Sequence, residues 1–202
     1  ALQDHGYVDP AHFLQQVEVL HVARADLDDV DVVLDVEAFL AARGAAVSFV
    51  HDLLSATASR PAQLGCFGLH EWAMVHGIPA DDVRHAGWPL RLGSRGTDAV
   101  VERHGIRCTH FDAYRFFTDS ARPRNTLRPN RDSQVAMEQP GCLHAGMDLY
   151  KHAYRLSPLV CSDLVADCFE LARDIRELDM RAAPYDRADL GYEPVRIETA
   201  AG

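Results

Sequence analysis

The sequence has only one lysine, Lys151, among its 20 basic residues. Chemistry that needs several lysines is therefore excluded, and a Schiff-base mechanism would have to use Lys151. The five cysteines are odd in number, and no two of them are spaced as CxxC. A disulfide framework or a cysteine-rich zinc site is not expected; reduced, mostly buried thiols in a cytoplasmic protein fit this pattern better.

Long apolar runs and phosphate-binding motifs are absent as well. No run approaches the roughly 18 apolar residues of a membrane span, and no secretory signal peptide is visible. The sequence contains no GxGxxG, no P-loop and no GxSxG motif. We therefore expect neither a membrane partner nor a nucleotide cofactor.

Net positive charge is also lacking, since the chain carries a formal charge of −10. Such a chain is poorly suited to non-specific binding of nucleic acid, so a DNA partner is disfavoured. The charge is uneven, however. Residues 26–37 form an acidic block without a base, whereas residues 91–131 hold nine arginines against four carboxylates. A local anionic ligand remains compatible with the second stretch.

Length and periodicity predict a mainly α fold. The 202 residues, 48% of them hydrophobic, suit a single bundle-like helical domain over 1–202, with long loops and at most a small β element. Helical spacing of apolar residues predicts helices over 36–58, 142–156 and 162–181, the last with Ser162 as its N-cap. Its apolar line predicts a core-facing stripe of Leu164, Cys168, Leu171, Ile175 and Leu178.

The remaining segments are less regular. Within the poorly readable segment 1–35, residues 12–25 fit a helix or a strand, and the alternation over 29–36 is typical of a strand. A glycine-rich turn enters a helix over 65–76, and Thr97 is expected to cap a short helix that reaches Glu102. Residues 119–141 read as a long basic loop, and 185–202 as a polar tail with a possible strand at 195–197.

The strongest group of candidate site residues lies in 138–154. His144, Asp148 and His152 are four residues apart, so they share one face of a helix, and Glu138 lies just ahead of it. A histidine and a carboxylate one turn apart can chelate a metal, or the carboxylate can orient the imidazole as a base. Alternatively, Asp148 pairs with a basic neighbour on a solvated face. Gly146 inside the helix favours a close approach of another element.

Two further histidine–carboxylate pairs are candidates for catalysis. His70 and Glu71 are neighbours and do not form an HExxH motif, yet either can act as a single ligand or a general base. If their segment is extended, His110 and Asp112 point the same way, among aromatic residues that would desolvate them. A surface histidine in the first case and a hydrogen-bonded core pair in the second are the alternatives.

The last helix adds Glu170, Asp174 and Glu177 on one flank. A dinuclear metal site in a helical bundle needs carboxylates and histidines from several helices. We predict a divalent ion (iron, manganese or zinc), and the proposed ligands are Glu138, His144, Asp148, Glu170 and Asp174. Glu177 is better explained by pairing with Arg173 or Arg181.

The arginines of the basic loop form a separate candidate site. Four of them could clamp the phosphate or carboxylate of a substrate, or simply lie in a solvated loop. They are Arg122, Arg124, Arg128 and Arg131.

Residues 55–198 resemble a bacterial family usually labelled "3-methyladenine DNA glycosylase". The resemblance rests on the strings at 56–76, 106–117, 138–151 and 167–186, which read ATASRPAQLGCFGLHEWAMVH, IRCTHFDAYRFF, EQPGCLHAGMDLYK and DCFELARDIRELDMRAAPYD. The label implies base excision, which needs a base-flipping pocket and a basic DNA track. The sequence has no helix-hairpin-helix GPG turn followed by a catalytic Asp, the arrangement of the well-understood alkyl-base glycosylases.

Three functions are thus open. The preferred one is an enzyme of the cytoplasm with a His/carboxylate site that uses a metal to activate water or dioxygen and acts on a small molecule. The others are a DNA glycosylase, as the resemblance implies, and a non-enzymatic binding protein. The sequence does not indicate the oligomeric state.

Overall fold

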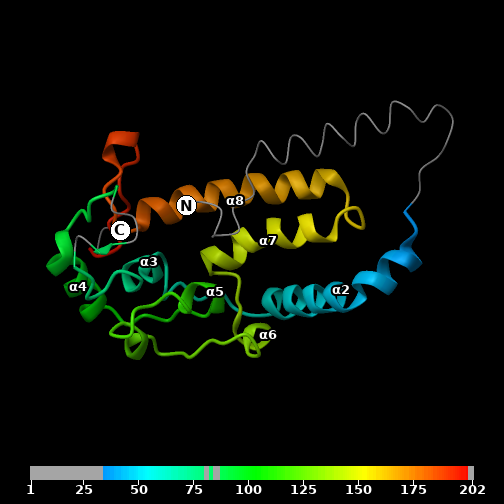
Figure 1. The fold of residues 1–202 in the computed structure, drawn as a ribbon, viewed down its shortest axis with the longest axis horizontal. Coiled ribbons are helices and arrows are strands. Elements are labelled where there is room, and N and C mark those ends of the chain that lie inside the picture. Colours follow the sequence, from blue (N-terminus) through cyan, green and yellow to red (C-terminus); the bar gives the residue numbers. More distant parts are fainter. Residues whose placement is uncertain (1–33, 80–81, 84–86, 200–202) are drawn as a thin grey trace. The chain divides into compact units, whose positions relative to one another are not determined.

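The computed structural model describes residues 34–79, 82–83 and 87–199 (Figure 1). The chain divides into two units, 1–35 and 36–202, and nearly all of the first lies outside the described residues. The prediction for 12–25 and most of the strand predicted over 29–36 therefore fall outside them too. Of the rest, residues 34 and 35 form no strand and Val36 is helical. The second unit is mainly helical, as the sequence predicts.

Three of its helices are long and match the periodicity of the sequence. These are α2 (Val36–Ala58), α7 (Leu143–Leu156) and α8 (Ser162–Ala182). The other α-helices are shorter: α3 (Leu69–Ala73), α4 (Gly93–Arg103), α5 (Phe111–Tyr114) and α6 (Gln134–Met137). Two 3-10 turns, η3 (Arg122–Arg124) and η4 (Ala188–Leu190), complete the elements of the described unit. Where the chain is described, β structure is limited to the isolated bridges Leu90↔Tyr185 and Ile106↔Asn125.

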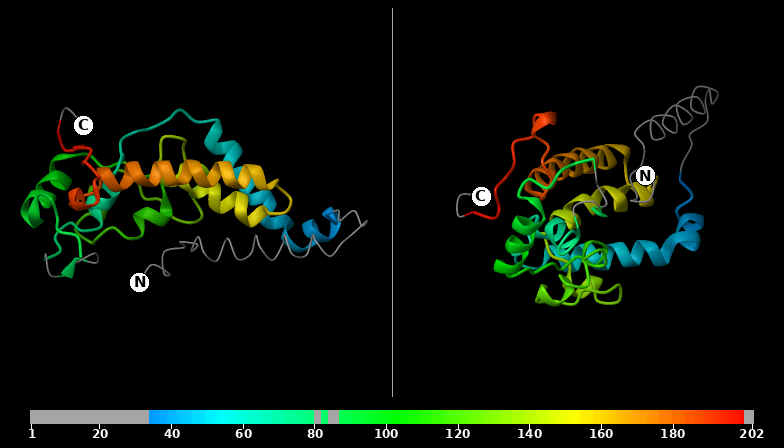
Figure 2. Two further views of the ribbon diagram at one scale, coloured as in Figure 1. Left: turned by 90° about the horizontal axis from the view of Figure 1, so that it is seen from above. Right: turned by 60° about the vertical axis from the view of Figure 1, so that its left-hand side comes forward.

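Helices α7 and α8 form a hairpin whose two members lie side by side in both figures (Figure 2). Gly146 of α7 permits this contact, because a Cβ there would lie 2.6 Å from Cδ1 of Ile175. The predicted stripe of α8 is only partly covered: Leu164 and Leu171 are each 45% exposed. Two paired helices cover only a narrow strip of each other, so the wider apolar face predicted for α8 stays partly open.

The hydrophobic core lies where α3, α4 and α5 meet. Trp72 and Ala73 of α3 pack there with residues of α4 and of the segment 106–121, namely Val100, Val101, Ile106, Cys108, Ala113, Phe117 and Ala121. Helix α6 packs against α2. No helix in the described ranges is long and apolar enough to cross a membrane.

Three local expectations need correction. Helix α4 begins at Gly93, and Thr97 lies inside it with its hydroxyl donating to the carbonyl of Gly93, four residues back. Cys161, not Ser162, is the N-cap of α8. Val195 to Ile197 form no strand, and Ile197 instead packs against the core.

Glycine is required at position 68, just before α3. Its φ is +74°, and a Cβ would lie 2.7 Å from that of Ala182. We expect Gly68→Ala to lower the free energy of unfolding by about 1–3 kcal/mol, through left-handed strain and overpacking. Gly44→Ala is the control, because nothing lies within 4 Å of its Cβ position inside α2. The control should stabilise the protein by up to about 1 kcal/mol, and chemical denaturation followed by circular dichroism measures both.

Candidate functional site

His110 is placed by an extended segment that ends at α5. As the N-cap of α5 it has φ −94° and ψ 118°, and it is only 1% exposed. Its Nε2 lies 3.3 Å from Oδ2 of Asp148 on α7 and 3.7 Å from Oε2 of Glu138. The side-chain amide of Gln134 on α6 donates to the same Glu138 oxygen at 3.1 Å. His110 therefore faces two carboxylates from different parts of the chain.

His70 belongs to the short helix α3 and makes a similar pair with α8. Its Nε2 lies 3.0 Å from Oδ1 of Asp179, and both side chains are almost fully buried. Arg176 contacts the other oxygen of Asp179 at 2.9 Å and lies 3.8 Å from Glu71. The His70 pair is thus linked to its neighbour Glu71 through one guanidinium.

His144, in the first turn of α7, lies against both of these histidines. Its ring centroid is 4.5 Å from that of His70 and 5.2 Å from that of His110. The three imidazoles and four nearby carboxylates are called the His–carboxylate cluster below. Its members are His70, His110, His144, Glu71, Glu138, Asp148 and Asp179.

Electrostatics set different proton states within the cluster. Burial alone would lower the pKa of His70, but the carboxylate of Asp179 outweighs it and raises that pKa to about 9. Burial opposes ionisation of Asp179 too, yet His70 and Arg176 hold its pKa well below the usual range. This pair is therefore ionised near neutral pH.

The pKa of His144 shifts in the opposite direction. Burial, followed by repulsion from His70, lowers the pKa of His144 to about 3. The imidazole is thus neutral at physiological pH, the form in which histidine binds a metal. In the same cluster, burial raises the pKa of Glu138.

Asp148 stays ionised. Burial disfavours its charge, but hydrogen bonding to His110 and the charge of Lys151 lower its pKa to about 2. Lys151 donates to Oδ2 of Asp148 and lies 3.9 Å from Asp112. Asp112 therefore lies beside the cluster, where it also pairs with Arg115 and Arg131.

Two buried ring nitrogens of the cluster, Nδ1 of His110 and Nδ1 of His144, have no hydrogen-bond partner. Nε2 of His70 and Oδ1 of Asp179 contact each other at 3.0 Å. His70, Glu71 and Asp179 each offer a ligand atom, and these three atoms lie within 4.8 Å of one another. Buried polar atoms without partners call for an explanation, of which a bound ion is one. This trio could hold a metal.

Three thiols adjoin the cluster, all in the reduced form. Sγ of Cys66 lies 3.5 Å from Nδ1 of His70, and Sγ of Cys108 contacts the carbonyl of His110 at 3.6 Å. A hydrogen bond from Cys66 lowers the pKa of Cys108 to about 7, against the effect of burial. Burial raises the pKa of Cys142, the N-cap of α7, to about 12.

Two predicted ligands do not reach the cluster. Glu170 and Asp174 are exposed on α8, and Asp174 pairs with its neighbour Arg173 at 3.0 Å. The carboxylate that α8 does contribute is Asp179, which the sequence analysis missed. Asp179 lies one turn beyond Ile175, the residue that contacts Gly146, so an acid on the packed line of the helix was the available signal.

The arginines of the basic loop already have protein partners. Arg122 and Arg128 donate to backbone carbonyls, and Arg124 pairs with Glu102 at 3.3 Å. Arg131 lies over the ring of Phe111 and near Asp112. Segment 119–141 is therefore tied down by these contacts and contains η3 and α6.

No family model, curated protein or solved structure matches the chain. The geometry of the cluster is therefore the basis for its proposed function.

Proposed function

We propose that the chain is a metal-dependent enzyme that acts on a small molecule at the His–carboxylate cluster. The observation that carries this proposal is the compact trio of His70, Glu71 and Asp179, beside which two buried imidazole nitrogens lack hydrogen-bond partners. Histidines and carboxylates from several helices are the donor set of iron, manganese and zinc sites in helical proteins. The free state of all five cysteines fits a protein of the reducing cytoplasm.

The positions of the side chains in the cluster indicate which of them would be metal ligands. His70, Glu71 and Asp179 form the compact trio, and the neutral imidazole of His144 lies beside it. The imidazolium of His70 would release its proton to solvent when the ion binds. A divalent ion held there would supply an activated water or a binding place for dioxygen. His110, paired with Asp148 and Glu138, is placed to accept and return a proton. Lys151 keeps Asp148 ionised so that Asp148 can orient that imidazole.

The DNA glycosylase alternative rests on the family resemblance alone. The basic loop is the best candidate for a DNA track, but three of its four arginines are bound to backbone carbonyls or to Glu102. The net charge of −10 also opposes such a track. We therefore favour the metalloenzyme.

Elemental analysis of protein purified without a metal-affinity tag tests the proposal. We expect near-stoichiometric iron, manganese or zinc in the wild type and loss of most of it in His144→Ala and in Glu71→Gln. Glu71 is the better choice, because the ion pair that it makes among the described residues is a 3.8 Å contact with a half-exposed arginine, so the variant should fold. Glu170→Gln makes the same change on the exposed side of α8 and should keep the metal.

Absence of metal from the wild type, even after refilling with each ion, would rule out the metalloenzyme. Equal metal content in Glu71→Gln and Glu170→Gln would instead remove Glu71 from the ligand set.

A further inference from the structure

A pocket lies on the side of the segments carrying His110 and Glu138 that faces away from the His–carboxylate cluster. In the extended segment 107–110, Cys108 and His110 contact the cluster, whereas Arg107 and Thr109 line the pocket. The second segment divides in the same way: Glu138 faces His110, and its two neighbours line the pocket. Successive side chains of extended chain point to opposite sides, so over 107–110 the two sites share a wall one residue thick. In the second segment the same separation occurs where α6 ends at Met137 and Glu138 is its extended C-cap.

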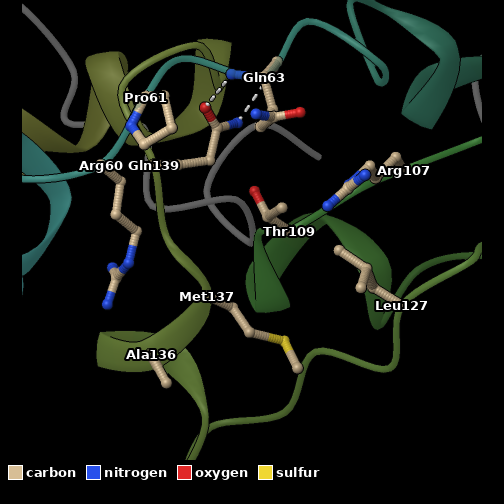
Figure 3. A pocket seen from close by; sticks show the side chains of 9 residues that line it. All are labelled: Arg60, Pro61, Gln63, Arg107, Thr109, Leu127, Ala136, Met137 and Gln139. Atoms are coloured by element: carbon tan, nitrogen blue, oxygen red, sulfur yellow. Dashed lines mark hydrogen bonds between the residues drawn. The ribbon is translucent and has the colours of Figure 1, made fainter.

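The pocket has a volume of about 280 Å³ (Figure 3). Two guanidinium groups flank it, and none of its lining residues is acidic. It is lined by Arg60, Pro61, Gln63, Arg107, Thr109, Leu127, Ala136, Met137 and Gln139. An apolar cavity of about 150 Å³ already holds a benzene ring, so this one has room for a ring and a charged head group.

The polar groups of the pocket differ in how they are engaged. Arg60 is anchored by a 2.7 Å hydrogen bond to the carbonyl of Glu138. The side-chain amide of Gln139 accepts from the backbone N–H of Gln63 and donates to the backbone carbonyl of Gln63, as the dashed lines in Figure 3 show. Thr109, by contrast, is 6% exposed, and its buried hydroxyl has no hydrogen-bond partner.

The hydroxyl of Thr109, the guanidinium of Arg107 and the side-chain amide of Gln63 therefore remain for a ligand. Arg107 is exposed, and its side chain extends toward Thr109 in Figure 3. A guanidinium beside a hydroxyl donor recognises carboxylate or phosphate oxygens. Apolar walls with a few convergent polar groups are typical of small-molecule sites.

We propose that this pocket binds a small organic anion, a carboxylate or a phosphate monoester. The anionic head lies at Arg107 and Thr109, and the apolar body contacts Leu127 and Met137. This binding needs none of the atoms offered by the metal-ligand trio, so it can be tested independently of the metalloenzyme proposal.

Titration calorimetry on the full chain, in the presence of EDTA, tests this inference with three probes. Benzoate and phenyl phosphate share the apolar ring and differ in head group, and inorganic phosphate lacks the ring. We expect saturable binding of at least one ring-bearing probe, tighter than that of inorganic phosphate. Saturation by benzoate alone identifies a carboxylate ligand, and saturation by phenyl phosphate alone identifies a phosphate ester.

Two variants place the ligand in this pocket. Arg107→Ala should weaken binding about tenfold or more, the loss expected for one charge-assisted contact. Arg103→Ala is the matched control, because Arg103 is exposed on α4 and donates to the carbonyl of Ala99 in its own helix. Thr109→Val should weaken binding several-fold without lowering stability, since the hydroxyl it removes has no partner in the protein.

Three results would overturn the inference. The first is no saturable binding of benzoate or phenyl phosphate in the millimolar range. The second is unchanged affinity in both Arg107→Ala and Thr109→Val. The third is inorganic phosphate binding as tightly as the ring-bearing probes, which would mean that the apolar walls do not contact the ligand.

Discussion

Asp179→Asn is expected to lower the free energy of unfolding by about 3–5 kcal/mol, the cost of breaking a buried ion pair from one side. Asp179 is fully buried between His70 at 3.0 Å and Arg176 at 2.9 Å. The amide is similar in size but neutral, so the positive charge of His70 would lose its buried counterion. Urea denaturation of metal-free protein, followed by circular dichroism, measures the change.

Asp174→Asn is the matched control for this prediction. It makes the same chemical change on the same helix, but Asp174 is exposed and pairs only with its neighbour Arg173. An exposed pair of this kind contributes at most about 1 kcal/mol, so the control should stay close to the wild type. Equal losses in the two variants would contradict the role given to Asp179.

The pH dependence of the same pair sharpens the test. The folded pKa of His70 is about 9 against an ordinary value of 6.5, so its contribution to stability is complete below pH 6.5 and is lost as the pH rises through 9. The pKa of Asp179 is depressed, so its contribution is present above pH 3.8 and is lost in acid. The difference between wild type and Asp179→Asn should therefore be largest between pH 3.8 and 6.5.

The long helices could be predicted because their signal is local. Apolar residues recur at helical spacing in α2, α7 and α8. The helix predicted to stop at Gly77 ends earlier, at Ala73 with Met74 as its C-cap, although Gly77 does have a positive φ. Helices α5 and α6 are four residues long, which is too short to hold a period. Their existence depends on tertiary contacts, such as that of α6 with α2.

Apart from Asp179, every residue of the cluster was a candidate from the sequence, but a shared spacing linked only His144 and Asp148. That spacing placed both on one face of α7, and both reach the cluster. The choice of acid on α8 was different, because in sequence only its helical register with Ile175 separates Asp179 from the other acids. Only the packing of α8 against α7 and α3 decides that Asp179 is the buried one.

The proximity of His70 and His144 could not be predicted from local sequence patterns either. The two residues belong to α3 and α7, and nothing in their spacing fixes the distance between those helices. That distance follows from how the five-residue α3 is anchored to the end of α8, and Trp72 is its main anchor. The indole of Trp72 is fully buried and donates to the carbonyl of Ala182 at 2.9 Å.

Trp72→Ala is accordingly expected to cost about 3–5 kcal/mol of unfolding free energy, the usual penalty for deleting a buried aromatic side chain. We expect this substitution to reduce metal binding at the site by more than the loss of stability alone would. A helix of five residues has almost no stability of its own. Without the indole, the contacts of His70 with Asp179 and of Glu71 with Arg176 would have to hold α3 against α8 without that support. Metal content should fall together with stability.

Trp72→Phe separates the two contributions of the indole. It keeps most of the buried ring but leaves the Ala182 carbonyl without its donor, which costs about 1–3 kcal/mol. If α3 is positioned by packing, Trp72→Phe should retain metal while Trp72→Ala loses it, as elemental analysis of the folded proteins would show. Loss of metal in both variants would assign the positioning to the hydrogen bond with Ala182, and retention in both would contradict the anchoring role of Trp72.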